Sequence, residues 1–221
     1  AAPTAPAISS IVSGAQKLTI TYGAYSSAND GGSAISKVEY SLDDGVTWAD
    51  SGTLSNPFVV SGLVNGQSYS VKLRAINAIG VSSASLATVA IPAAIPAAPQ
   101  IARVSSAEQS VTVTWDAPSS DGGSVITSYK ASAYSASSGG ASVQSCSTAT
   151  LTCSITGLTN GSSYYISVTA TNAIGESAES APRILGLPAA APGAPTISSI
   201  TGGSNYLSVA FTAGTQDANA P

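Results

Sequence analysis

The feature that most constrains this chain is a pattern at residues 156–179, TGLTNGSSYYISVTATNAIGESAE. Leu158, Gly161 and Tyr164 lie three positions apart, and from Tyr164 to Asn172 every second residue then belongs to one face. A period of two is typical of a β-strand with one buried face. Asn160 and Gly161 favour a tight turn just before it. The pattern therefore predicts a turn that leads into a long strand.

The same pattern occurs at residues 61–80, where Leu63, Gly66 and Tyr69 take the corresponding places, and Leu63 lies 95 positions before Leu158. A second shared element is an alternating apolar triplet that ends in an aromatic residue. It occurs three times, as Leu18, Ile20 and Tyr22; as Val111, Val113 and Trp115; and as Leu207, Val209 and Phe211. A period of about 95 residues indicates independent domains, because solenoid repeats are only about 20–50 residues long.

These motifs resemble the fibronectin type III family, and they are most similar to the tandem modules of bacterial secreted and surface proteins. The resemblance implies an all-β chain of tandem immunoglobulin-like (fibronectin type III) β-sandwiches. It also implies a tyrosine corner in each module, in which the tyrosine hydroxyl bonds the backbone just upstream. The structural core positions that it implies are Tyr22, Trp115, Phe211, Leu63, Tyr69, Leu158 and Tyr164.

The expected domain boundaries follow segments rich in Pro and Ala, a composition that favours extended, semi-rigid backbone. Two strands cannot bury Val209 and Phe211 on their own. We therefore expect the last segment to be a piece of a longer array, or to complete a module on another copy by strand donation. The second interpretation is weakened because both complete modules own matching first and second strands. The expected parts are module 1 at 1–92, a linker at 93–98, module 2 at 99–187, a linker at 188–194, and the first two strands of an incomplete third module at 195–221.

The two cysteines, Cys146 and Cys153, fall in the second module. Cys153 takes the place of Phe58, 95 positions earlier, so its side chain is expected to face inward. The interpretations are a structural disulfide, a redox pair and half of a metal site. The disulfide is favoured because the sequence has no CxxC spacing, no His and no further Cys. A persistent disulfide indicates an oxidising compartment, so we expect an extracellular or cell-surface location.

Charge is scarce in this sequence. Charged residues make up 8% of the chain, against about 25% in ordinary soluble proteins. The seven cationic residues are scattered, whereas nucleic acid and anionic membranes require clustered Lys and Arg. No apolar run approaches the roughly 18 residues of a membrane span. We therefore expect neither nucleic acid as a partner nor membrane insertion.

Residues that could carry chemistry are few. The chain has no His, which excludes a Ser/His/Asp triad or a Cys/His dyad within it. Asp43 and Asp44 precede Gly45, and this turn signal favours a solvated hairpin over a Ca²⁺ site or an acid–base pair. We expect no catalytic residue, no metal site and no cofactor. Trp48 and Tyr134 are the candidate ligand-facing residues, which either stack on sugar rings or cover the flanks of their own sheets.

The sequence thus predicts a non-catalytic extracellular structural or spacer repeat of a surface protein, stalk or filament. The alternative is an adhesion or carbohydrate-binding module attached to a secreted polysaccharide-degrading enzyme. The expected partners are other copies of the chain, neighbouring modules, or glycans. The loops most available to a partner are 26–33 with 78–83, and 119–124 with 173–179, which should cluster at one end of each sandwich.

Overall fold

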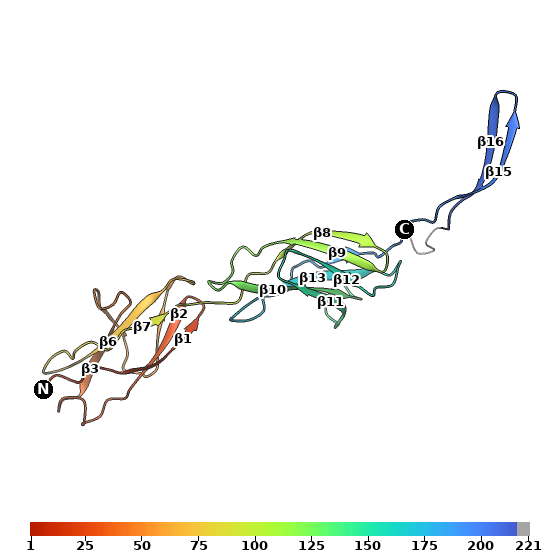
Figure 1. Cartoon of the computed structure of the whole chain (residues 1–221). Helices are drawn as coiled ribbons and strands as arrows, with labels where there is room; N and C mark the ends of the chain where they lie inside the picture. The colour runs from red at the N-terminus through yellow and green to blue at the C-terminus, as the bar shows by residue number, and fades with distance from the viewer. Residues whose placement is uncertain (216–221) are drawn as a thin grey trace. The chain divides into compact units, whose positions relative to one another are not determined.

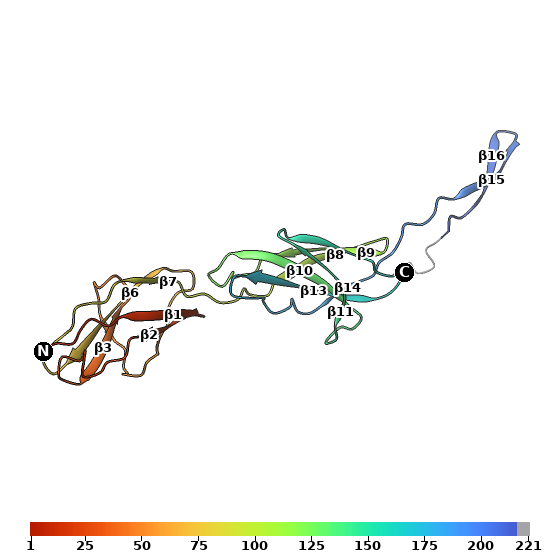
Figure 2. The same ribbon diagram turned by 60° about the horizontal axis from the view of Figure 1, so that its bottom comes forward.

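A computed structural model describes residues 1–215, and all the regular structure in these residues is β (Figures 1 and 2). Contacts between residues divide the chain into two units. Unit 1 comprises Ala1–Ile95 with Ser120–Val125, and unit 2 comprises Pro96–Ser119 with the chain from Ile126 onward. Residues 1–215 contain no helix that is long and apolar enough to cross a membrane.

Unit 1 is a sandwich of two antiparallel sheets, which lie on opposite sides of one core (Figure 1). The first sheet has the order β1-β2-β5, with β1 at Ile8–Gly14, β2 at Lys17–Tyr22 and β5 at Phe58–Ser61. The second has the order β4-β3-β6-β7, with β4 at Ala49–Asp50, β3 at Ile35–Ser41, β6 at Tyr69–Asn77 and β7 at Thr88–Ala90.

The core of unit 1 follows from alternation along β2 and β6. In β2 the inward residues are Leu18, Ile20 and Tyr22, which are all buried, and in β6 they include Val71 and Leu73. Full burial of one such side chain contributes about 1.5–3 kcal/mol. The remaining buried members of this cluster are Val38, Phe58, Val60, Leu63 and Ala90.

Unit 2 repeats this arrangement (Figure 2). One sheet has the order β12-β9-β8, with β12 at Thr152–Thr156, β9 at Ser110–Asp116 and β8 at Gln100–Ala107. The other has the order β11-β10-β13-β14, with β11 at Ser142–Thr148, β10 at Ile126–Tyr134, β13 at Tyr164–Asn172 and β14 at Ile184–Gly186. The buried cluster is Val111, Val113, Trp115, Tyr129, Ala131, Ala133, Ile155, Leu158, Ile166, Val168 and Ala170.

A tyrosine fixes the turn before the long strand in each unit. The Tyr69 hydroxyl accepts a hydrogen bond from the Val64 amide at 3.0 Å. The Tyr164 hydroxyl accepts one from the Thr159 amide at 3.1 Å. Both rings are partly buried and pack against the core of their unit. This is the geometry of a tyrosine corner.

Buried serines accept hydrogen bonds from backbone amides of β6 that the short strand β7 leaves unpaired. The Ser82 hydroxyl accepts from the Ala75 amide and the Ser85 hydroxyl from the Leu73 amide, each at 3.0 Å. These amides lie in the core, where an unsatisfied donor would cost about 1–3 kcal/mol. Unit 2 repeats the device with Ser177 on Ala170 and Ser180 on Val168.

A separate hairpin follows the two sandwiches. It pairs β15, Thr196–Gly203, with β16, Tyr206–Thr212, and every residue of both strands is exposed. Phe211 was expected in a core, and this is wrong for the described residues, since its exposed fraction is 66%. The physical reason is that no second sheet covers β16 within residues 1–215.

Candidate functional site

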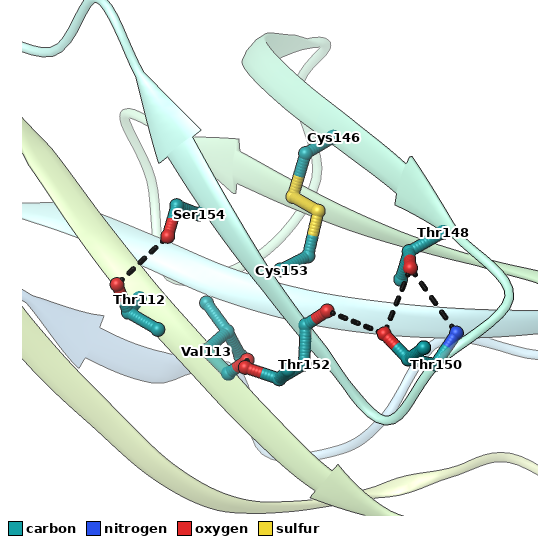
Figure 3. Close-up of a disulfide and its surroundings, with 8 residues drawn as sticks. All are labelled: Thr112, Val113, Cys146, Thr148, Thr150, Thr152, Cys153 and Ser154. Carbon is teal, nitrogen blue, oxygen red and sulfur yellow. Dashed lines mark hydrogen bonds between the residues drawn. A yellow bond between two sulfur atoms is a disulfide. The ribbon is translucent and has the colours of Figure 1, made fainter.

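The two cysteines form a disulfide at the open side of the unit 2 sandwich (Figure 3). Cys146 lies on β11 and Cys153 on β12, which belong to different sheets, and their Cα atoms are 6.3 Å apart. Both side chains are partly buried against the core. The predicted disulfide is confirmed, and it ties the two sheets together at their edges.

Hydroxyl groups brace the connection between β11 and β12 (Figure 3). The Thr152 hydroxyl donates to the Val113 carbonyl at 3.1 Å, and the Thr150 hydroxyl donates to the Thr152 carbonyl at 3.2 Å. The hydroxyls of Thr112 and Ser154 lie 2.9 Å apart across β9 and β12. Hydrogen bonds between hydroxyl and backbone groups therefore hold the strands and the turn around the two cysteines in place.

Trp48 lies on the flank of the β3–β6 sheet and is only partly exposed. Its Nε1–H donates to the Gly45 carbonyl at 3.0 Å. The Arg74 guanidinium carbon lies 4.3 Å from the ring centroid, in a cation–π arrangement. One face of the candidate ring is therefore already covered by its own sheet.

Arg74 belongs to an ion-pair network centred on Glu39. The carboxylate of Glu39 contacts Lys37 Nζ at 2.8 Å and Arg74 Nη2 at 2.6 Å. The hydrogen bond from Lys37, followed by those from Arg74, outweighs burial and holds the pKa of Glu39 below its usual range. Every charge in this network has a partner of opposite sign, so the network itself needs no ligand.

Asp43 and Asp44 serve the β3–β4 turn. Hydrogen bonds from the Thr47 hydroxyl and then the Ser41 hydroxyl lower the pKa of Asp43 to about 2. Asp44 pairs with Lys72 at 3.0 Å. The part of the chain that the structure describes contains no group of three or more His, Cys, Asp or Glu residues that could hold a metal ion.

Tyr134 lies where a ligand would not reach its ring. Its exposed fraction is 9%, and the Arg183 guanidinium carbon lies 3.4 Å from the ring centroid. The Tyr134 hydroxyl donates to Glu179 Oε1 at 2.7 Å. Arg183 also donates to the carbonyls of Ala136 and Gly139. The prediction that Tyr134 faces a ligand is therefore wrong. Its ring packs against Arg183, which binds the loop after β10.

A cleft of about 370 Å³ opens in unit 1 beside the loop at residues 26–33. The Tyr25 hydroxyl donates to the Thr4 carbonyl at 2.7 Å, and burial, with a smaller effect of Tyr22, raises the pKa of Tyr25 to about 12. Asp30 Oδ1 accepts from the Gly32 amide at 2.8 Å. The residues that line the cleft are Tyr22, Ala24, Tyr25, Ser26, Asp30, Ala34, Ile35, Leu54 and Asn56.

The turn asparagines have a role that the sequence patterns did not reveal. Asn65 Oδ1 accepts from the Gln16 amide at 2.7 Å, and Asn160 Oδ1 accepts from the Gln109 amide at 2.7 Å. Gln16 and Gln109 have φ values of 55° and 51°, a region that non-glycine residues rarely adopt. Each asparagine thus joins the tyrosine corner to the tight turn of the first hairpin. A signal was present, since Gln and Asn recur at the same places in both repeats.

Comparison with known proteins identifies the family of the second sandwich. Residues 97–185 match the model of the fibronectin type III domain. A crystal structure of the FN1–FN3 domains of chicken CNTN1 is similar to this chain, with a TM-score of 0.46 and 20% sequence identity, and the match covers 85% of this chain and 68% of that one. Unit 1 has the strand order and core positions of unit 2. The matched residues are therefore a fibronectin type III domain, and unit 1 is a second β-sandwich with the same strand order.

Proposed function

We propose that this chain is a non-catalytic structural or spacer repeat of an extracellular surface protein, stalk or filament. The observation that carries the proposal is the way in which the backbone leaves each unit. The Gly66 amide donates to the Pro92 carbonyl at 2.8 Å, and the Gly161 amide donates to the Pro188 carbonyl at 2.8 Å. Both units therefore hold their outgoing Pro/Ala segment at the same turn.

This contact limits how freely the outgoing segment can move. Gly66 and Gly161 have φ values of 80° and 74°, which glycine adopts without steric cost. Pro92 and Pro188 have their own φ fixed by the pyrrolidine ring. A segment that is held at one residue and stiffened by proline keeps its direction relative to its own unit, and a spacer requires this property.

The disulfide and the surface composition support the extracellular part of the proposal. A bond between Cys146 and Cys153 persists in oxidising compartments outside the cytoplasm. The low charged fraction of 8% bears on the spacer role instead, because it leaves little charged surface with which to recognise an acidic or basic partner.

A distance measurement between the two units tests the spacer function. Nitroxide labels at Val59→Cys and Lys130→Cys lie on exposed strand positions in unit 1 and unit 2. Pulsed electron–electron double resonance should give a narrow distribution of distances between the two labels, and replacing Pro92 and Pro96 with Gly should broaden it. An unsubstituted linker with a distribution as broad as that of the glycine variant would contradict the proposal.

A second candidate function is adhesion or carbohydrate binding, as part of a secreted polysaccharide-degrading enzyme. It is favoured by the cleft in unit 1 with its Tyr25 ring, and by the uncovered part of Trp48. A glycan array tests it, with Trp48→Ala and Tyr25→Ala as variants and Tyr165→Ala as a control in unit 2. Binding that either unit 1 variant abolishes, and the control preserves, would favour this function over a spacer.

Turnover of any polysaccharide by the purified chain would contradict the non-catalytic assignment.

A further inference from the structure

Each sandwich has one asparagine that is followed by glycine, and both pairs lie in the turn of the tyrosine corner. They are Asn65 with Gly66 in unit 1 and Asn160 with Gly161 in unit 2, and no other asparagine of the sequence precedes a glycine. Asparagine is one of the chemically labile residues of proteins. A following glycine increases this lability, because a residue without a Cβ does not hinder the approach of its own nitrogen to the asparagine side chain. Each turn could therefore be modified without an enzyme.

The reaction is an attack of the Gly66 main-chain nitrogen on Cγ of Asn65. The nitrogen gives up its proton to hydroxide, the new bond between nitrogen and Cγ closes a five-membered succinimide ring, and the bond between Cγ and Nδ2 breaks to release ammonia. Water then opens the ring at one of its two carbonyl carbons. Opening at Cγ gives aspartate. Opening at the main-chain carbonyl carbon gives isoaspartate, in which the backbone runs through the former side chain.

In unit 1 the folded structure holds both reacting groups. The Gly66 amide, which must lose its proton, donates to the Pro92 carbonyl at 2.8 Å. Asn65 Oδ1 accepts from the Gln16 amide at 2.7 Å, which fixes the orientation of the side-chain carbonyl. Pro92 is fully buried, so solvent has little access to its contact with Gly66. The attack on Cγ therefore requires the Pro/Ala segment to leave the turn first.

Unit 2 holds its own pair in the same way. The Gly161 amide donates to the carbonyl of the buried Pro188 at 2.8 Å. Asn160 Oδ1 accepts from the Gln109 amide at 2.7 Å. The two sites thus share one set of contacts, and each is covered by the Pro/Ala segment that leaves its own unit.

We propose that Asn65 and Asn160 are sites of deamidation to aspartate and isoaspartate, and that the docked Pro/Ala segment of each unit controls the reaction. A docked segment holds the glycine amide on a proline carbonyl, and the reaction is slow. A segment that has left the turn frees the glycine nitrogen to attack.

Isoaspartate makes the release of the segment permanent. Its backbone gains one CH₂ group before Gly66, which moves the Gly66 amide away from the Pro92 carbonyl. Aspartate instead keeps an oxygen in the place of Asn65 Oδ1 and preserves the contact with Gln16. The chemistry is independent of the proposed spacer function, and only the resulting loss of stiffness rests on it. A broad distance distribution in the unmodified chain would contradict the spacer and leave the deamidation sites unaffected.

Peptide mapping by mass spectrometry tests the reactivity of each asparagine separately. The full chain is incubated in mildly alkaline buffer, once folded and once in urea. Both sites should convert in urea, and in the folded chain each should convert about tenfold or more slowly, because two hydrogen bonds must open first. Absence of conversion in urea, or equal rates in the folded and unfolded chain, would overturn the proposal.

Two matched variants test the control by the Pro/Ala segments. Pro92→Gly and Pro188→Gly each remove one buried ring and free the backbone that the ring restrains. Pro92→Gly should speed deamidation of Asn65 and leave Asn160 unchanged, and Pro188→Gly should do the reverse, so each variant contains its own control. Hydrogen exchange at the buried Leu73 amide should show that unit 1 of Pro92→Gly stays folded. Acceleration at both sites, at neither, or only together with loss of that protection would refute the proposal.

Discussion

Reduction of the disulfide should destabilise unit 2 and leave unit 1 unchanged. The bond closes a short loop from Cys146 to Cys153, seven positions apart. In the loop-entropy description, a closure of this size stabilises the folded state by about 2–3 kcal/mol. Reduction keeps both sulfur atoms in the core, so it isolates the effect of the covalent link from that of side-chain packing.

The chain contains one tryptophan in each unit, and this makes the assay selective. Trp115 is buried in unit 2, and Trp48 lies on the flank of unit 1. Urea unfolding followed by fluorescence is therefore performed on Trp48→Phe to report unit 2 and on Trp115→Phe to report unit 1. For a domain of this size the dependence on urea is about 1 kcal/mol/M, so the midpoint of unit 2 should fall by about 2–3 M on reduction.

The unit 1 transition is the internal control, because both cysteines lie in unit 2. An equal shift in both transitions would show that the reductant acts on something other than this bond. A unit 2 midpoint that does not move would refute the reasoning, since it would mean that the link between the two sheets does not restrict the unfolded chain.

Three further predictions concern hydrogen bonds and charge. Tyr164→Phe removes the acceptor of the Thr159 amide and should lower the free energy of unfolding of unit 2 by about 1 kcal/mol, as measured by urea denaturation. Ser180→Ala leaves the buried Val168 amide without its hydroxyl acceptor and should cost about 1–3 kcal/mol, with faster amide exchange at that residue. The folded-state pKa of Glu39 is lowered, so its contribution to the stability of unit 1 is present above the ordinary value of 4.5 and is lost as the pH falls below it. A plot of the free energy of unfolding against pH should therefore be less steep on its acid side in Glu39→Gln. An unchanged plot would contradict this assignment.

Much of each sandwich could be predicted from alternation alone. A buried face shows itself in sequence because inward positions must be apolar, as at Leu18 and Ile20 in β2. The repeat then aligned Cys153 with the inward Phe58, which led to the confirmed disulfide. These inferences succeed because they depend on the local period and on the internal repeat.

The residues that were misjudged depend on contacts far along the chain. Tyr134 has no distinctive local pattern, and its ring is covered by Arg183, 49 positions later. Phe211 has the pattern of a core residue, but its burial depends on a second sheet that the described residues do not provide. Ser85 was not singled out by the sequence patterns, although its hydroxyl accepts the hydrogen bond of the buried Leu73 amide. A period of two indicates which residues share one face of a strand, but it does not indicate which part of the protein packs against that face.

Single-molecule pulling from the two ends of the chain tests the central claim most directly, which is that two independent sandwiches form a tandem spacer. The account predicts two separate unfolding events, each releasing up to about 300 Å of chain for a unit of about 90 residues. Reduction should lengthen the event of unit 2 by about 18 Å, because about 25 Å of extended chain between the cysteines replaces the 6.3 Å that the disulfide spans, and it should leave the other event unchanged. A single combined event, or an added length in both events on reduction, would contradict the account.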